Sequence, residues 1–142
     1  MLAGQFALVV SALFTGAAFY INIAEQPARL LLEPKALLTE WKKSYERGYA
    51  MQASLVVIGF LLGMLAWWQT REVAWVIGAG IFLVNWPWTL LVIMPVNNRL
   101  KKIDPADAGA RGLVERWATL HAARTGLGLL ATAIFLWSST RA

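Results

Sequence analysis

Four long runs of apolar residues, separated by polar connections, dominate the chain. They extend over about residues 2–24, 50–68, 73–94 and 119–138. Each run approaches the roughly 20 residues that a helix needs to cross about 30 Å of hydrocarbon. No stretch has the alternating pattern, about ten residues long, of a membrane strand. The pattern therefore predicts an all-α, integral membrane four-helix bundle with an up-and-down order.

The connection ahead of the second run has a helical pattern of its own. Trp41, Tyr45 and Tyr49 recur at every fourth position, so they share one face of a helix. Charged residues of both signs occupy the other faces. We therefore expect the second membrane helix to begin outside the membrane, near Pro34.

Prolines and acidic residues mark further bends and ends. Pro87 lies inside the third run, where it crowds the carbonyl of Leu83 and predicts a kink. Asp104 followed by Pro105 is typical of a helix start, and we expect a helix to run unbroken from Asp107 into the last run. No repeat, low-complexity segment or linker interrupts the sequence, so residues 1–142 are expected to form one domain.

The composition excludes several classes of protein. Hydrophobic residues make up 58% of the chain and charged residues 15%, against about 45–50% and 25% in soluble globular domains. So little charge excludes an intrinsically disordered chain. The chain has no cysteine and a single histidine, so it offers no thiolate nucleophile and no cysteine or multi-histidine metal site. No metal is therefore predicted.

The chain is basic, with 13 Lys and Arg against 8 Asp and Glu, and its basic residues are distributed unevenly. The connections after the first and third runs carry Arg29, Lys35, Lys42, Lys43, Arg47, Arg99, Lys101, Lys102, Arg111, Arg116 and Arg124, whereas Arg71 and Arg141 lie on the other side. The positive-inside rule then predicts cytosolic long connections and both termini outside, in a membrane that we expect to be bacterial and inner. Because these charges cluster at helix ends and alternate with acids, they indicate the lipid bilayer as partner and not nucleic acid.

Tryptophans near the ends of the runs are typical interfacial anchors. This interpretation covers Trp67, Trp68, Trp75 and Trp137 on the outer side, and Trp41 and Trp117 on the cytosolic side. For Trp41 and Tyr45, a position that faces a substrate is an equally open alternative.

Polar and aromatic residues converge on one depth of the predicted bundle. In an up-and-down order, the ends of the first and third runs, the start of the last run and the extension before the second run all lie on the cytosolic side. The residues brought to that depth are Asn22, Glu25, Trp41, Tyr45, Thr89, Asn97, Trp117, His121 and Arg124. Polar side chains within a membrane are costly and usually face the bundle interior, so this cluster is the candidate site.

The members of this cluster also have structural alternatives. His121 is a natural general base, because an unperturbed imidazole titrates near neutral pH, but it could equally donate a hydrogen bond between helices. Arg124 could stabilise an oxyanion or form a salt bridge with Glu25. Asn97 follows Pro95 and could satisfy carbonyls that the proline frees.

Four segments carry these residues in a fixed order. They read FTGAAFYINIAEQPARL at the end of the first run, WKKSYERG ahead of the second, PWTLLVIMPVNNRL at the end of the third and RWATLHAARTGLGL at the start of the last. Together they resemble the anthrone oxygenase family of small four-helix membrane proteins, over nearly the whole chain. The resemblance implies an oxygenase that converts a reduced polycyclic phenol to a quinone with dioxygen and without a metal or flavin cofactor.

The resemblance also implies a role for each residue of the cluster. His121 would remove the methylene proton of an anthrone-like substrate, with Glu25 as the second choice of base. Arg124 and Asn97 would stabilise the resulting anion. The residues expected to bind the apolar aromatic substrate are Trp41, Tyr45, Trp117, Asn22 and Thr89.

Other functional classes remain open. A non-catalytic membrane module would use the same cluster as a lock between helices or as a pocket for a lipid, a quinone or haem, with His121 and a methionine as axial ligands. Gly59 and Gly63 form a small-xxx-small pair that could pack helices within the bundle or in a homodimer. A transporter or channel is disfavoured, because no inverted repeat or charged midplane is visible.

Overall fold

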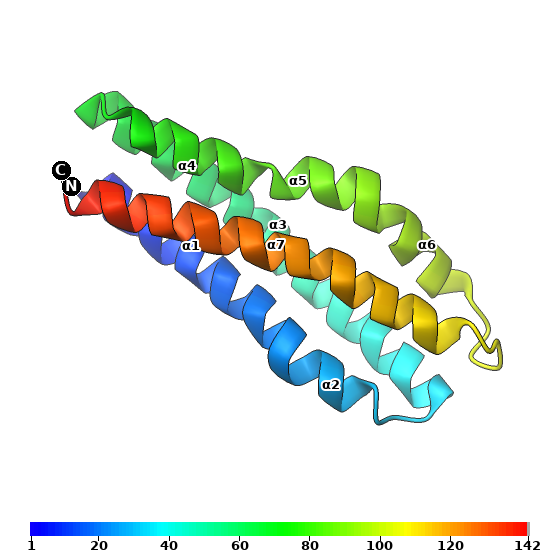
Figure 1. Ribbon diagram of the computed structural model, residues 1–142. Helices are drawn as coiled ribbons and strands as arrows, with labels where there is room; N and C mark the ends of the chain where they lie inside the picture. The colour runs from blue at the N-terminus through cyan, green and yellow to red at the C-terminus, as the bar shows by residue number, and fades with distance from the viewer. Residues whose placement is uncertain (142) are drawn as a thin grey trace.

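Four helical rods run side by side in the computed structural model, which describes residues 1–141 (Figure 1). The first rod consists of α1 (Leu2–Tyr20), the π-helical segment η1 (Ile21–Glu25) and α2 (Gln26–Arg29), and the second is α3 (Pro34–Thr70). The third rod consists of α4 (Val73–Leu83), α5 (Asn85–Trp88), the π-helical segment η2 (Thr89–Ile93) and α6 (Met94–Lys102), and the fourth is α7 (Ala110–Ser139). Each rod is long and apolar enough to cross a membrane. The predicted all-α membrane bundle is confirmed, and the chain is an integral membrane protein.

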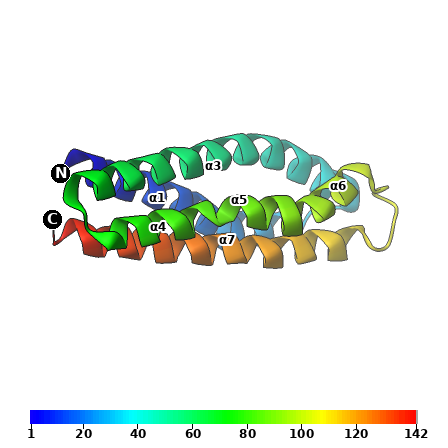
Figure 2. The ribbon, with the colours of Figure 1, turned by 90° about the horizontal axis from the view of Figure 1, so that it is seen from above.

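Consecutive rods run in opposite directions. Both termini lie at one end of the bundle and both longer connections lie at the other, which we call the connection end (Figures 1 and 2). α1 packs against α3 and α7, and α4 packs against the same two helices, so the rods form a closed ring. The turn between α3 and α4 is short because Arg71 adopts a left-handed conformation (φ 61°) and donates its N–H to the carbonyl of Trp67.

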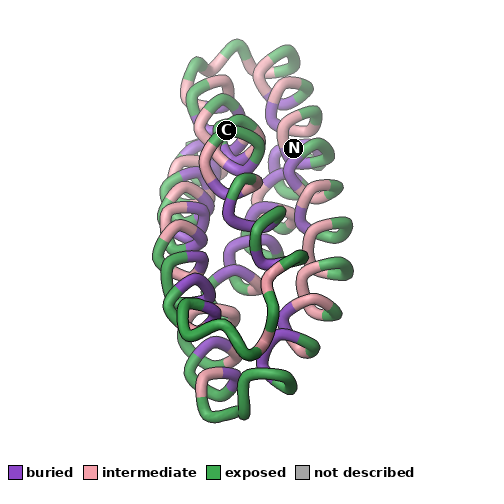
Figure 3. The backbone as a smooth tube through the Cα atoms, turned by 90° about the vertical axis from the view of Figure 1, so that its right-hand side faces the viewer, coloured by how far each residue is buried: buried purple, intermediate pink, exposed green. Residues whose placement is uncertain are grey.

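Apolar side chains cover much of the outer surface. Residues that face outward are exposed along all four rods, and residues that face the bundle axis are buried (Figure 3). The exposed apolar side chains include Phe6, Leu13, Leu61 and Leu91, which are 56%, 58%, 59% and 75% exposed. A bilayer solvates apolar surface as readily as the protein interior does, so this exposure suits a bundle that spans a membrane.

Small residues allow the rods to approach closely. A Cβ on Gly63 would lie 3.0 Å from the Cβ of Ala79 and 3.0 Å from Cζ of Phe135, and Gly59 lies against the ring of Phe82. Both glycines are buried. The small-xxx-small pair is therefore used inside the bundle, and the homodimer gains no support from it.

The structure confirms one predicted helix start and corrects another. α3 begins at Pro34, as expected from the aromatic spacing. α7 begins at Ala110, so the helix expected from Asp107 was wrong. The carboxylates of Asp104 and Asp107 instead accept the N–H groups of Ala106 (2.8 Å) and Gly109 (2.7 Å), which folds the connection into successive turns.

Prolines coincide with the irregular positions in the rods. The α-helix of the third rod is interrupted at Val84, just before Pro87, where a kink was predicted. Pro27 and Pro95 each follow closely after a π-helical segment. Proline lacks an N–H and crowds the carbonyl four residues earlier, which in both cases belongs to the π-helical segment. The wider π turn accommodates the ring, and both π-helical segments lie toward the connection end.

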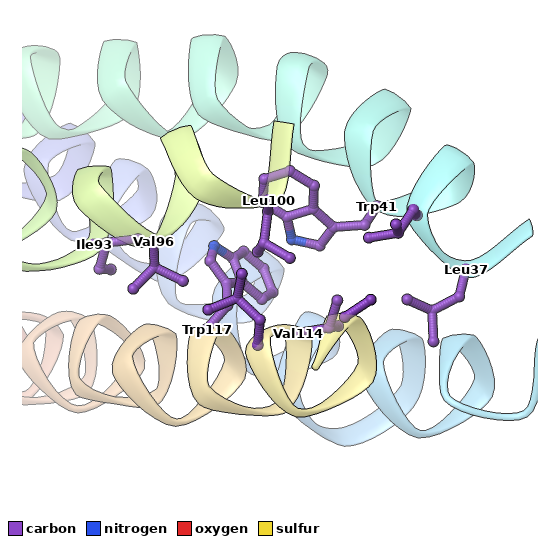
Figure 4. Close-up of a cluster of buried hydrophobic side chains, with 10 residues drawn as sticks. Leu37, Trp41, Ile93, Val96, Leu100, Val114 and Trp117 are labelled. Carbon is purple, nitrogen blue, oxygen red and sulfur yellow. The ribbon is translucent and has the colours of Figure 1, made fainter. Parts of the chain in front are cut away.

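Three tryptophans predicted as interfacial anchors lie in the core. Trp41 and Trp75 are fully buried and Trp117 is 5% exposed, so the anchor interpretation was wrong for them. Figure 4 shows Trp41 and Trp117 inside a cluster of apolar side chains near the connection end. Spacing along the sequence does not say whether an aromatic residue faces the bundle axis or the lipid. The tryptophans with the exposure of an anchor are Trp68 and Trp137, at 62% and 55%.

Candidate functional site

A small cavity lies between the rods toward the connection end. Its lining comes from η1, α3, η2, α6 and α7, so every rod contributes. The lining residues that the sequence predicted are Tyr45, Thr89, Asn97, Trp117, His121 and Arg124, and those that it missed are Ile21, Ser44, Gly48, Tyr49, Gln52 and Ile93. The up-and-down order thus brings together most of the predicted cluster. Asn22, Glu25 and Trp41 do not line the cavity and lie behind its wall.

Asn22 holds the imidazole of His121 from behind. Its Nδ2 donates to the carbonyl of Ala118 (3.1 Å), and its Oδ1 accepts from the hydroxyl of Thr125 (2.8 Å). With the amide oriented in this way, Oδ1 is the atom that lies 3.2 Å from Nδ1 of His121. An amide oxygen only accepts hydrogen bonds, so Nδ1 carries the proton and Nε2 of the neutral imidazole keeps its lone pair.

Arg124 brings a positive charge into the bundle without a carboxylate beside it. Its side chain is buried, and its Nε has no hydrogen-bond partner. The ion pairs within residues 1–141 all involve Arg29, so the salt bridge considered between Arg124 and Glu25 is absent there. The guanidinium carbon lies 5.4 Å from the ring centre of Phe14. A guanidinium that faces a cavity in a medium of low dielectric constant attracts an anionic ligand.

Glu25 is engaged with Arg29 at the end of the first rod. Arg29 donates from Nη2 to Glu25 and from Nε to Glu40. The hydroxyl of Ser44 donates to the same carboxylate oxygen of Glu25. These contacts tie α2 to α3 and occupy Glu25, which does not line the cavity and is not paired with Arg124 within residues 1–141.

A stack of aromatic rings forms the wall at the connection end. The rings of Trp41 and Tyr45 are nearly parallel, at 9° and 5.0 Å between centres. Trp117 meets the edge of Trp41 at 5.8 Å and stacks on the imidazole of His121 at 5.0 Å. Trp117 and Tyr45 line the cavity, and Trp41 supports them from behind. Nζ of Lys101 lies 4.9 Å from the ring centre of Tyr45, and Cζ of Arg29 lies 5.6 Å from a ring centre of Trp117. A planar aromatic ligand would therefore stack on these rings only by displacing such contacts.

Several residues that line the cavity carry polar atoms without partners in residues 1–141. Both amide atoms of Gln52 and both of Asn97 are unpaired, as are the hydroxyl of Thr89 and the indole N–H of Trp117. Leaving one buried polar group unpaired costs about 1–3 kcal/mol, so such groups normally have partners. Here a ligand or water in the cavity would supply them. The sequence did hold a signal for Gln52, which is the one amide within residues 50–68.

The cavity is too small to hold a polycyclic ligand in this conformation. It offers about 30 Å³ to water, and a neighbouring cavity of about 10 Å³ shares Tyr49, Thr89 and Arg124 with it. Sites for small-molecule ligands have volumes of about 300–1,000 Å³. Side chains must therefore move when such a ligand binds. Tyr49 is half-buried and lines both cavities, so a movement of its side chain would join the two cavities.

Known proteins similar to this chain come from fungi. Anthrone oxygenase tpcL of Aspergillus fumigatus is 28% identical over 142 residues, which cover 92% of this chain and 88% of the relative. An anthrone oxygenase of Claviceps purpurea is 29% identical over 139 residues, which cover 87% of this chain and 80% of the relative. No solved structure matches the chain.

A family model agrees with these relatives. The model described as anthrone oxygenase matches residues 41–134, which is more than half of the chain. The matched region includes most of the cavity lining, from Ser44 to Arg124. Asn22 and Glu25 lie before it. The chain therefore belongs to the anthrone oxygenase family.

Proposed function

We propose that this protein is an anthrone-oxygenase-like membrane enzyme that oxidises a reduced polycyclic phenol to a quinone in the cavity beside His121. The observation that carries the proposal is the orientation of His121, whose Nδ1 is held by Asn22 while its ring lines the cavity. The same cavity holds the guanidinium of Arg124. A base beside a fixed cation favours the removal of a proton from a weakly acidic methylene group. The names of the two fungal relatives support the same reaction.

The first step is a proton transfer. Nε2 of His121 takes a proton from the methylene carbon that lies opposite the substrate carbonyl. The electron pair left on that carbon is delocalised through the rings onto the carbonyl oxygen. Arg124 and the amide of Asn97 stabilise the resulting oxyanion, because both lack partners in the same cavity. Trp117 and Tyr45 bind the faces of the rings.

The second step is the reaction of this anion with dioxygen. The anion transfers one electron to dioxygen, and the carbon radical and superoxide combine into a peroxide that takes up the proton held by His121. The remaining hydrogen on that carbon then leaves as a proton, the O–O bond breaks, and water departs. The net reaction converts the substrate and dioxygen to the quinone and water. The substrate supplies all the electrons that dioxygen accepts.

The orientation of the bundle is part of the proposal. Most basic residues lie toward the connection end, so the positive-inside rule puts that end, and the site, on the cytosolic side, with both termini outside. The apolar substrate and dioxygen both dissolve in the bilayer and are concentrated around the bundle. A bacterial inner membrane gains no support from the relatives, since both are fungal.

Quinone formation by the purified protein tests the proposed function. We expect wild type in detergent to oxidise anthrone, followed by absorbance, and His121→Ala to lower kcat by about 10²–10⁴-fold. Thr119→Ala is the matched control, because Thr119 lies on the exposed face of the same helix and should leave kcat unchanged. A wild-type rate equal to that of a detergent blank, or full activity of His121→Ala, would contradict the proposal. Quinone binding without turnover would instead favour a binding module.

A further inference from the structure

Gln52 carries a buried amide that the reaction described above does not use. It lies within α3, is 1% exposed, and lines the same cavity as His121 and Arg124. Neither Nε2 nor Oε1 has a hydrogen-bond partner. Gln52 belongs to a helix long and apolar enough to cross a membrane, and hydrocarbon offers no partner to an amide. Such a group is costly to retain unless something in the cavity binds it.

Three other polar side chains in the bundle differ from Gln52 in one respect. Asn22, Gln26 and Trp88 each donate to a backbone carbonyl of α7, at 3.1, 3.3 and 3.0 Å. These bonds lock neighbouring rods together. Gln52 makes no such bond within residues 1–141, although it is buried whereas Asn22 and Trp88 are half-buried. Gln52 is nevertheless one of the residues that line the cavity, so its amide does not serve as a lock between helices and is left for a ligand that enters there.

Asn97 offers a second unpaired amide to the same cavity. It lies on α6 and is fully buried, and its amide makes no hydrogen bond of normal length within residues 1–141, although the Tyr45 hydroxyl lies close enough for a weak one. Gln52 and Asn97 thus present a donor and an acceptor each, from two different rods. A carbonyl oxygen needs donors only, whereas a phenolic hydroxyl donates and accepts and is matched by an amide. The cavity accordingly has more hydrogen-bonding capacity than one oxyanion uses.

We propose that Gln52 is a specificity-determining residue, whose amide binds a phenolic hydroxyl on the ring system and so selects hydroxylated substrates over the bare ring ketone. The inference rests on the proposed function and deepens it. A site built to hydrogen-bond a substrate hydroxyl discriminates strongly against an analogue that lacks the hydroxyl, because the amide is then buried without a partner. The residue has no part in the proton transfer itself.

The test compares two substrates in two variants. Wild type, Gln52→Leu and the control Ser54→Leu are assayed with unsubstituted anthrone and with an anthrone that carries hydroxyls beside the carbonyl. Ser54 is exposed on the same helix, so Ser54→Leu makes a similar change of polarity on the outer face. We expect Gln52→Leu to lower the ratio of kcat/KM for the hydroxylated over the unsubstituted substrate by about 10–100-fold, through KM, since one lost hydrogen bond to the substrate leaves the chemistry unchanged.

Two further measurements separate this inference from its alternatives. If Gln52→Leu lowers kcat/KM equally for both substrates, or changes only the thermal midpoint in detergent, Gln52 is structural and the inference is wrong. If wild type oxidises neither substrate, the proposed function fails, but the inference is still tested by binding. Quenching of tryptophan fluorescence by hydroxylated and unsubstituted anthraquinone then reports the same ratio, and an equal effect of Gln52→Leu on both affinities would overturn it.

Discussion

The side-chain oxygen of Asn22 lies 3.2 Å from Nδ1 of His121, and it joins the first rod to the last. Asn22 cannot turn its amide over, because Nδ2 is needed by the carbonyl of Ala118 and Oδ1 by the hydroxyl of Thr125. The tautomer of His121 is therefore set by contacts outside the cavity. In the proposed reaction Asn22 acts through the imidazole, as a positioning residue.

Removing the amide of Asn22 should lower activity without abolishing binding. In Asn22→Leu, Nδ1 of His121 loses its acceptor, so the imidazole is free to rotate and to change tautomer. We expect kcat to fall by about 10–100-fold, a common cost of losing an outer partner of a functional histidine, while KM changes little. Thr125→Val is the matched control, because it removes another bond to the same Oδ1 and leaves the contact with Nδ1 in place. Equal losses of kcat in both variants would contradict a specific role for the contact with His121.

Arg124 should matter more for activity than for stability. Its charge is buried beside a cavity without a carboxylate, so the fold gains little from it. In Arg124→Met we expect kcat to fall by about 10²–10³-fold, the usual effect of losing one oxyanion-stabilising group. The thermal midpoint in detergent should stay unchanged or rise. A large fall in that midpoint, with activity per folded molecule preserved, would show that Arg124 is structural.

The depth at which the site residues meet could be predicted from the sequence. The lengths of the apolar runs fix the number of rods, and an up-and-down order fixes which ends lie together. Those two facts place Asn97, His121 and Arg124 at one level, as observed. Neither fact depends on how a helix is rotated about its axis.

The facing of individual side chains could not be predicted in the same way. On a regular α-helix, residues three positions apart, such as Asn22 and Glu25, lie on about the same face. The π-helical segment over Ile21–Glu25 has a wider turn, which changes the angle around the helix axis between the side chains of Asn22 and Glu25. Asn22 consequently faces α7, whereas Glu25 faces Arg29 and Ser44. Gln52 was missed for a different reason: it stands out as the one amide within residues 50–68, but only the structure shows that its amide lacks a partner within residues 1–141.

Arg29 should matter more for stability than for the chemical step. Its guanidinium is buried and joins Glu25, Glu40 and Ser44 at the end of the first rod. Arg29→Met leaves both carboxylates without their partner. We expect the free energy of unfolding to fall by about 1–3 kcal/mol. This is less than the cost of breaking a fully buried ion pair, because the carboxylate side chains are 22% and 35% exposed.

The measurement for Arg29→Met is the free energy of unfolding in mixed detergent. Arg99→Met serves as control, because Arg99 is exposed on α6 and its loss should change the stability by less than about 0.5 kcal/mol. The kcat of the folded Arg29→Met fraction should remain within a few-fold of wild type, since Arg29 does not line the cavity. Similar stability of the two variants would mean that the network contributes nothing to the fold.

Two glycines of α7 should respond oppositely to the same substitution. A Cβ on Gly128 would lie 2.7 Å from the hydroxyl oxygen of Thr15 and 3.0 Å from the ring of Phe14, so Gly128→Ala forces α1 and α7 apart. We expect it to destabilise the bundle by about 1–3 kcal/mol, the usual cost of overpacking. A Cβ on Gly126 would meet nothing within 4 Å, so Gly126→Ala should be neutral or stabilise the helix by up to about 1 kcal/mol. Unfolding in mixed detergent compares the two, and a destabilisation of equal size in both would contradict the close approach of α1 and α7 at Gly128.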